Sequence, residues 1–173
     1  MESDEELMRA VAQGDERALA SLVERHAARI HAFLARVLGD RDDADDLLQD
    51  TWMRVARGAR GFDASRKVRP WLYGIAANLA RDQHRRRAVR VRALREGTLE
   101  ASQAQTAPKP VERIDMRERL ARLPERLREV LVLRYFDGLD EAEMADALGI
   151  PRGTVKSRLH GALRELRQGW ETT

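Results

Sequence analysis

The side chains best suited to a binding function lie on one helix near the end of the chain. This helix is expected to begin at Pro151 and to bury Val155. At 100° per residue, the side opposite Val155 collects basic and hydrogen-bonding groups, which can read base edges in the major groove of DNA. Hydroxyl groups, a guanidinium and the free N–H groups of the first turn lie beside this polar face and can bind DNA phosphates. The predicted chemistry is therefore DNA binding, although His160 by itself could be an ordinary surface histidine. The residues are Lys156, His160 and Arg164 on the polar face, and Thr154, Ser157 and Arg158 beside it.

A short helix predicted from Asp140 to Leu148 must position this polar face. Ala145 is small enough for two crossing helices to approach closely, and Gly149 can adopt the positive φ of a sharp turn. With Val155 starting the buried stripe of the second helix, the spacing is typical of a DNA-reading helix-turn-helix. An ordinary amphipathic hairpin with a solvated basic face is the alternative.

A second basic helix is predicted from Pro70 into an arginine-rich tract at residues 81–95. Its apolar stripe contains Leu72 and Leu79, and the opposite face carries groups that can contact a base edge or phosphates. Trp71 and Tyr73 lie beside the basic loop 63–69 and could stack on unpaired bases, although core packing is favoured for Trp71. The residues of the opposite face are Asn78, Arg81 and Arg85.

Residues 40–50 form an acidic segment with six aspartates and one arginine. Asp43, Asp46 and Asp50 share one helix face, with Gln49 beside it. Carboxylates repel DNA, so this face is predicted to meet a basic protein surface. The spacing lacks the third ligand, the turn glycine and the closing glutamate of a calcium loop, so we expect no metal site.

The remaining elements also read as helices, which predicts an all-α chain. Capping residues and apolar periodicity divide it into a helical domain at 1–92, a linker at 93–112 and a helical domain at 113–173. Ala, Ser, Gln and Thr dominate the linker, which ends near Pro108 and Pro110, so we expect it to be flexible and then locally stiff. The expected helices span residues 3–14, 15–39, 42–57, 70 into the arginine tract, 114–123, 124–137, 140–148 and 151–168.

The composition excludes several classes of protein. The chain has 173 residues and a formal net charge of +3, from 32 Lys+Arg and 29 Asp+Glu. It has no cysteine, so disulfide scaffolds and thiolate zinc sites are excluded. No apolar run reaches the about 18 residues of a membrane span, and no signal peptide follows Met1, so we expect a cytoplasmic protein without membrane insertion.

Five motifs, in this order, resemble the extracytoplasmic-function (ECF) sigma factors of bacterial RNA polymerase, group IV of the primary-type sigma family. The resemblance covers almost the whole chain and implies two helical domains, sigma region 2 and sigma region 4, joined by the linker. The motifs are Asp46–Thr51, Pro70–Asn78, Leu123–Arg126, Leu133–Leu139 and Gly149–His160.

The resemblance implies a role for each charged surface. Asp46, Gln49 and Asp50 would dock on the β′ coiled coil of core RNA polymerase. The fourth helix would read and open the −10 promoter element, the linker would run toward the RNA exit channel, and region 4 would contact the β flap. An anti-sigma factor is the expected partner. The implied −10 residues are Ser65, Arg66, Lys67, Asn78, Arg81 and Arg85, and the implied −35 residues are Arg152, Lys156, Ser157, Arg158 and His160, beside Thr154 and Arg164 from the helix geometry.

Two departures from the family pattern are visible: Gly161 stands where many relatives carry a long side chain, and Asp140 replaces a common serine. The expected function is a promoter-specificity subunit that starts transcription of a stress or signal response. A stand-alone two-domain helix-turn-helix regulator is the alternative. An enzyme is the least favoured class, because no catalytic triad order, phosphate loop or metal cluster is present, and no cofactor or catalytic residue is expected.

Overall fold

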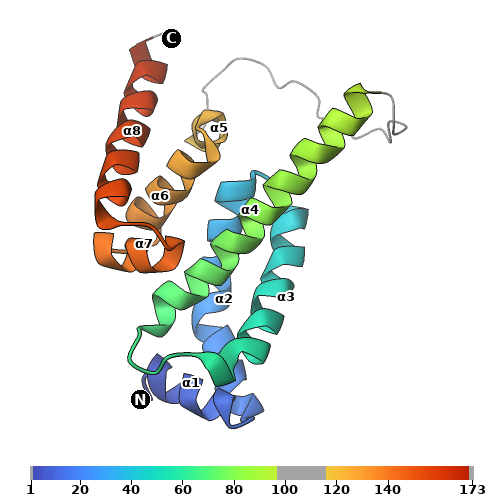
Figure 1. The fold of residues 1–173 in the computed structure, drawn as a ribbon, viewed down its shortest axis with the longest axis vertical. Helices are drawn as coiled ribbons and strands as arrows, with labels where there is room; N and C mark the ends of the chain where they lie inside the picture. Colours follow the sequence, from blue (N-terminus) through green and yellow to red (C-terminus); the bar gives the residue numbers. More distant parts are fainter. Residues whose placement is uncertain (1, 97–115, 172–173) are drawn as a thin grey trace.

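The computed structural model describes residues 2–96 and 116–171, and its regular secondary structure in this part of the chain is helical, without strands. The all-α fold class predicted from the sequence is confirmed (Figure 1). The N-terminal helices are α1 (Asp4–Ala12), α2 (Glu16–Leu38), α3 (Arg41–Gly58), the short 3-10 helix η1 (Ala59–Gly61) and α4 (Val68–Arg95). The C-terminal helices are α5 (Met116–Arg122), α6 (Glu125–Tyr135), α7 (Glu141–Leu148) and α8 (Arg152–Glu171).

Helices α1 and α2 begin at the caps that the sequence indicates, whereas α3 begins at Arg41 and α4 at Val68, one and two residues before the predicted starts. The Ser3 hydroxyl accepts the Glu6 N–H at 3.1 Å while the Glu6 carboxylate accepts the Ser3 N–H at 2.7 Å, which forms a capping box. Asp15 caps α2 by accepting the backbone N–H groups of its first turn. Gly39 ends α2 at a φ of 72°, a conformation that only glycine adopts without strain.

The N-terminal core lies between α2, α3 and α4. Leu22, Ile30 and Phe33 of α2 are fully buried, as are Val55 of α3 and Leu72 of α4. Burial of each such side chain stabilises the fold by about 1.5–3 kcal/mol. The apolar stripe predicted for the fourth helix therefore faces the core as expected.

Helix α4 is longer than the domain that it helps to build. It continues to Arg95, and its last turns extend away from the other helices (Figure 1). The first residues of the predicted linker, 93–95, therefore continue this helix. The rest of the predicted linker, residues 97–112, lies outside the described residues, and the division at 92 and 113 stays a prediction.

The C-terminal helices form a second core that positions α8. Asp140 and Glu143 form a capping box at the start of α7, and Gly149 ends α7 at a φ of 64°. Val155 and Ala162 of α8 are completely buried. The predicted helix-turn-helix is thus present, with the small Ala145 on α7 packed against the core.

The two sets of helices lie against one another. Helix α7 packs on α4, while α5 and α6 pack on α2 (Figure 1). This arrangement places α7 on the side of α4 that lies opposite Leu72, the side predicted to meet DNA.

Candidate nucleic-acid interface

The polar face of α8 is open to solvent. Lys156, His160 and Arg164 are exposed on the side turned away from the buried Val155, and Arg152 is exposed at the first residue of the helix. Ser157 is exposed as well, and its hydroxyl donates to the Thr154 carbonyl at 3.0 Å. The structure therefore keeps these predicted DNA-contacting residues on one accessible surface.

Arg158 is placed differently from the other predicted residues of α8. It is half-buried and lines a small cleft together with Arg81 of α4 and Glu129 of α6. A guanidinium on this flank faces the boundary between the two sets of helices. In this arrangement Arg158 is therefore not part of the open face.

The predicted DNA face of α4 is largely covered by α7. Gly74 and Ala77, which share this face with Asn78 and Arg81, are both buried. Arg81 Nε donates to the Glu129 carboxylate at 3.1 Å, and its Nη1 donates to the side-chain oxygen of Asn78, also at 3.1 Å. Asn78 nevertheless remains exposed at the edge of α7.

Arg85 lies one turn beyond this covered segment. It is exposed and forms an ion pair with Asp82 of the same helix. Of the three α4 residues predicted to contact DNA, only Arg81 is thus held by the C-terminal helices.

The basic loop before α4 makes the same kind of contact. Arg66 Nη2 lies 3.2 Å from the Asp146 carboxylate, and Lys67 Nζ lies 3.0 Å from that of Glu143. The hydrogen bond to Glu143 raises the pKa of Lys67 above its ordinary value. Ser65 instead bonds within the loop, to Asp63 at 2.7 Å. Two of the three predicted loop residues therefore meet carboxylates of α7.

Tyr73 is fully buried, which contradicts the idea that it stacks on bases from this position. Its hydroxyl donates to the Asp137 carboxylate at 2.9 Å, and Arg69 donates to the Asp137 backbone carbonyl. Burial raises the pKa of the Asp137 carboxyl, against the hydrogen bond from Tyr73. Sequence reasoning missed this contact because its two residues are 64 positions apart.

Trp71 packs on Phe62, with ring centroids 4.9 Å apart, and lies partly buried against the core. The core packing favoured for Trp71 from the sequence is therefore confirmed.

The acidic surface on α3 is smaller than predicted. Asp46, Gln49 and Asp50 are exposed, and among the described residues neither aspartate forms an ion pair. Asp43 is instead half-buried, accepts a hydrogen bond from Gln83 at 2.9 Å and pairs with Arg87. Asp43 therefore belongs to the packing of α3 on α4, and the accessible set is Asp46, Gln49 and Asp50.

Comparison with known proteins identifies the family. Residues 22–90 match the family model of sigma-70 region 2, and residues 113–166 match that of sigma-70 region 4. The ECF RNA polymerase sigma factor SigW of Bacillus subtilis is 30% identical over 171 residues, which cover 91% of each chain. The chain belongs to the ECF RNA polymerase sigma factors. The ECF sigma factor SigL of Mycobacterium tuberculosis is 34% identical over 155 residues, 86% of each chain.

A solved structure extends the likeness over the whole sigma factor. CnrH, in complex with the cytosolic domain of CnrY, is 30% identical, has a TM-score of 0.75 and is matched over 99% of both chains. The sigma factor is thus a promoter-specificity subunit of RNA polymerase, and the stand-alone regulator is not favoured. Within the described residues, no helix is long and apolar enough to cross a membrane.

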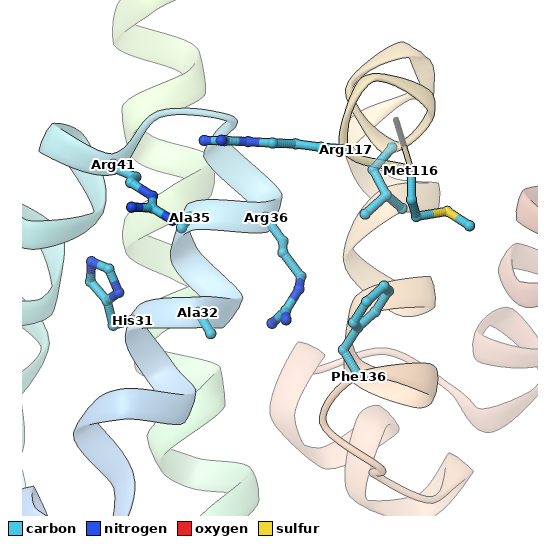
Figure 2. Close-up of a pocket in the computed structure, with 9 residues that line it drawn as sticks. His31, Ala32, Ala35, Arg36, Arg41, Met116, Arg117 and Phe136 are labelled. Carbon is cyan, nitrogen blue, oxygen red and sulfur yellow. The ribbon is translucent and has the colours of Figure 1, made fainter. Parts of the chain in front are cut away.

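The sigma factor also has a groove that the sequence did not indicate. A cavity of about 350 Å³ lies between α2 and the α5–α6 pair. Figure 2 shows Ala32, Ala35 and Arg36 on one wall, with Met116 and Phe136 facing them. The Arg36 guanidinium lies 4.4 Å from the centre of the Phe136 ring. Its walls come from segments about 80 to 100 residues apart in sequence, so no local pattern could have revealed it.

Proposed function

We propose that this sigma factor places RNA polymerase on promoters through three separate surfaces. The exposed acidic residues Asp46, Gln49 and Asp50 of α3 bind the β′ coiled coil of core polymerase. The basic loop and the polar face of α4 bind the −10 element, and α8 binds the −35 element. The −10 residues are Ser65, Arg66, Lys67, Asn78, Arg81 and Arg85; the −35 residues are Arg152, Thr154, Lys156, Ser157, Arg158, His160 and Arg164.

The separation of charge between α3 and α8 carries this proposal. The exposed residues Asp46, Gln49 and Asp50 of α3 are acidic or neutral, whereas the open face of α8 is basic. Phosphates attract the second surface and repel the first, so one protein partner and one DNA partner fit them best. Each surface contributes binding, and we expect no catalytic step on this chain.

Two linked DNA contacts explain why such a factor needs polymerase. Each domain offers only a few base and phosphate contacts, so the free chain binds promoters weakly. When polymerase holds both domains at the promoter spacing, the second contact becomes intramolecular and gains effective concentration. Captured unpaired bases of the −10 element then offset the unstacking cost of a few kcal/mol per base.

An anti-sigma factor is the second partner that we propose. The similar structure of CnrH contains the cytosolic domain of CnrY, and a further fold neighbour is a sigma factor in complex with the anti-sigma factor NepR, at 24% identity and a TM-score of 0.69. Because polymerase and promoters share one compartment, the sigma factor is expected to act in the cytoplasm.

Polymerase pull-down with charge-reversal variants tests the docking surface. Asp46→Arg combined with Asp50→Arg should abolish capture of core polymerase and transcription in vitro. Glu24→Arg is the matched control, because Glu24 is also exposed on a helix but lies on α2. If the double variant captures polymerase as well as the control does, the assignment of α3 is wrong.

Transcription in vitro with core enzyme, followed by mapping of the start sites, tests the DNA surfaces. Lys156→Ala and His160→Ala should reduce initiation at promoters with a −35 element without reducing polymerase capture. Tight promoter binding by the free chain, with no transcription when core enzyme is added, would instead support the stand-alone regulator.

A further inference from the structure

Helix α4 begins without a cap from the residue that precedes it. Lys67 occupies the capping position but makes no side-chain hydrogen bond to the helix, and Pro70 in the first turn has no backbone N–H group. The first N–H groups of a helix have no partner inside the helix and need another acceptor when they are buried. Val68, the first residue of α4, is completely buried. Its N–H group therefore requires an acceptor from another part of the chain.

The acceptor is Glu5 of α1. Its carboxylate oxygen Oε1 accepts the Val68 N–H at 3.1 Å, across 63 positions of sequence. A carboxylate suits this place, because the N-terminal end of a helix carries a partial positive charge. Asp15 and Asp40 cap α2 and α3 from the residue before each helix, whereas Glu5 caps α4 from a different helix.

Helix α1 is held in a position that presents this carboxylate to α4. Leu7 and Met8 are buried on its inner face. At its start, the Asp4 carboxylate accepts a hydrogen bond of 2.9 Å from Arg25 Nη1 of α2. Helix α1 also contacts η1 and α4 (Figure 1), and Glu5 is half-buried there. The position of Glu5 therefore follows from the packing of the N-terminal domain.

The capped residue lies next to the loop that we assign to the −10 element. Within this loop, the Asp63 carboxylate accepts the backbone N–H of Ser65 at 2.9 Å and its hydroxyl at 2.7 Å. At the other end of the loop, Lys67 directly precedes Val68. The loop is therefore fixed at both ends, by a carboxylate of its own and by the carboxylate of Glu5.

We propose that Glu5 is a positioning residue for −10 recognition, because its cap on α4 sets the conformation of loop residues 65–67. The inference rests on the proposed −10 role of this loop. Glu5 acts through the start of α4 and makes no DNA contact of its own. A loop that is already fixed loses less conformational entropy when it binds, and it presents its side chains in one arrangement rather than in several.

Loss of the cap should affect selectivity and leave polymerase binding unchanged. Without Glu5, the Val68 N–H has lost its acceptor, and the first turn of α4 opens more often. The loop then adopts several arrangements, so it distinguishes the bases of the −10 element less well. The proposed polymerase-docking residues lie on α3, away from this cap. A hydrogen bond of ordinary net strength corresponds to an effect of about fivefold.

Three variants isolate the cap. Glu5→Ala removes the acceptor, whereas Glu5→Gln keeps a side-chain oxygen that can accept the Val68 N–H. Glu6→Ala is the matched control. Glu6 is the exposed neighbour whose carboxylate accepts the Ser3 N–H, so its loss weakens the start of α1 but leaves the acceptor of Val68 in place. Alanine and glutamine both favour helices, so α1 should stay helical in all three variants.

Hydrogen exchange of the Val68 amide, measured by NMR on the free protein, reports on the cap directly. Glu5→Ala should accelerate this exchange about fivefold relative to the wild type. Glu5→Gln should keep most of the protection, and Glu6→Ala should have a smaller effect than Glu5→Ala. Equal acceleration in Glu5→Ala and Glu6→Ala, or no acceleration in either, would show that Glu5 does not cap α4.

Transcription in vitro with core polymerase tests the role of the cap in recognition. Each variant is assayed on a mapped promoter and on versions with single base-pair changes in the −10 element. Glu5→Ala should capture core polymerase as the wild type does, but discriminate about fivefold less at one −10 base pair. Glu5→Gln and Glu6→Ala should discriminate nearly as well as the wild type.

Two results would overturn the proposal. Faster Val68 exchange with unchanged −10 discrimination would make the cap of Glu5 purely structural, and so would an equal loss of transcription on every promoter version. A wild type that shows no preference at any −10 base pair would instead contradict the proposed function of the loop. The exchange measurement separates these cases, since it uses neither polymerase nor DNA.

Discussion

The hydroxyl of Tyr73 donates a hydrogen bond of 2.9 Å to the carboxylate of Asp137, and this bond joins α4 to the segment that follows α6. Both residues are almost completely buried. Burial raises the pKa of the Tyr73 phenol, so the phenol stays protonated and keeps donating. The second Asp137 oxygen has no hydrogen-bond partner among the described residues, so the carboxylate depends on Tyr73 and nearby arginines.

Tyr73→Phe should therefore weaken the contact between the domains. The substitution keeps the ring and its edge contact with Phe33 but leaves a buried carboxylate without its donor. Loss of a hydrogen bond to a charged group lowers the free energy of unfolding by about 1.5–3 kcal/mol. Urea unfolding, monitored by circular dichroism, measures this loss in the free energy of unfolding. Tyr135→Phe, at an exposed position, should change the free energy by less than about 0.5 kcal/mol; equal effects of the two variants would argue against the buried bond.

His84 predicts a pH dependence of stability. It lies on α4, with its Nδ1 3.1 Å from Glu125 of α6 and with Arg128 and Arg87 nearby. Burial lowers its pKa below the ordinary histidine value, and the two arginines add to this while Glu125 opposes it. The unfolded chain therefore takes up a proton at a higher pH than the folded chain does.

It follows that His84 contributes stability above the ordinary histidine pKa and that this stability is lost as the pH falls toward the lowered value. The slope is at most about 1.4 kcal/mol per pH unit. Thermal unfolding at pH 7.5 and 5.5 should show a lower Tm at pH 5.5, and His84→Gln should reduce the difference. His160→Gln, on the open face of α8, should retain it. If the Tm difference between the two pH values is the same in His84→Gln as in the wild type, then other groups cause the pH dependence.

Asp140 tests the capping of α7. It accepts the Glu143 N–H at 2.8 Å, and Glu143 accepts the Asp140 N–H at 3.1 Å. Asp140→Ala should lower the free energy of unfolding by about 1 kcal/mol, because the Glu143 N–H loses its side-chain acceptor, although the backbone N–H of residue 140 can still donate to Glu143. Asp140→Ser is the matched control, because serine caps helices about as well. Chemical denaturation distinguishes them, and equal losses in both variants would exclude a capping role.

The sequence correctly predicted the features that a single helix or turn determines. The caps at Ser3, Asp15 and Asp140, the turn at Gly149 and the basic face of α8 all follow from local periodicity and hydrogen bonding. These features involve residues within a few positions of each other, so the chain itself specifies them.

The contact between the domains could not be predicted in the same way. The sequence places Asn78 and Arg81 on the face of α4 opposite the core, and such a face is normally solvated. In the structure, Glu129 and α7 cover this face of α4. The side-chain contacts that hold them there join residues about 50 to 75 positions apart in sequence. A Cβ atom on Gly74 would lie 2.8 Å from the backbone carbonyl oxygen of Ala147, so the close approach of α7 to α4 requires glycine here, which the sequence analysis did not predict.

Salt dependence tests which α8 residues contact phosphates. Each phosphate contact releases counterions, so a variant that loses one contact shows a shallower decrease of promoter affinity with salt. Lys156→Ala in the reconstituted holoenzyme should reduce the slope of log affinity against log salt by about 1. Arg17→Ala, an exposed cation at the start of α2, should leave it unchanged. If Lys156→Ala instead weakens binding equally at all salt concentrations and relaxes selectivity at one −35 base pair, then Lys156 reads a base edge rather than a phosphate.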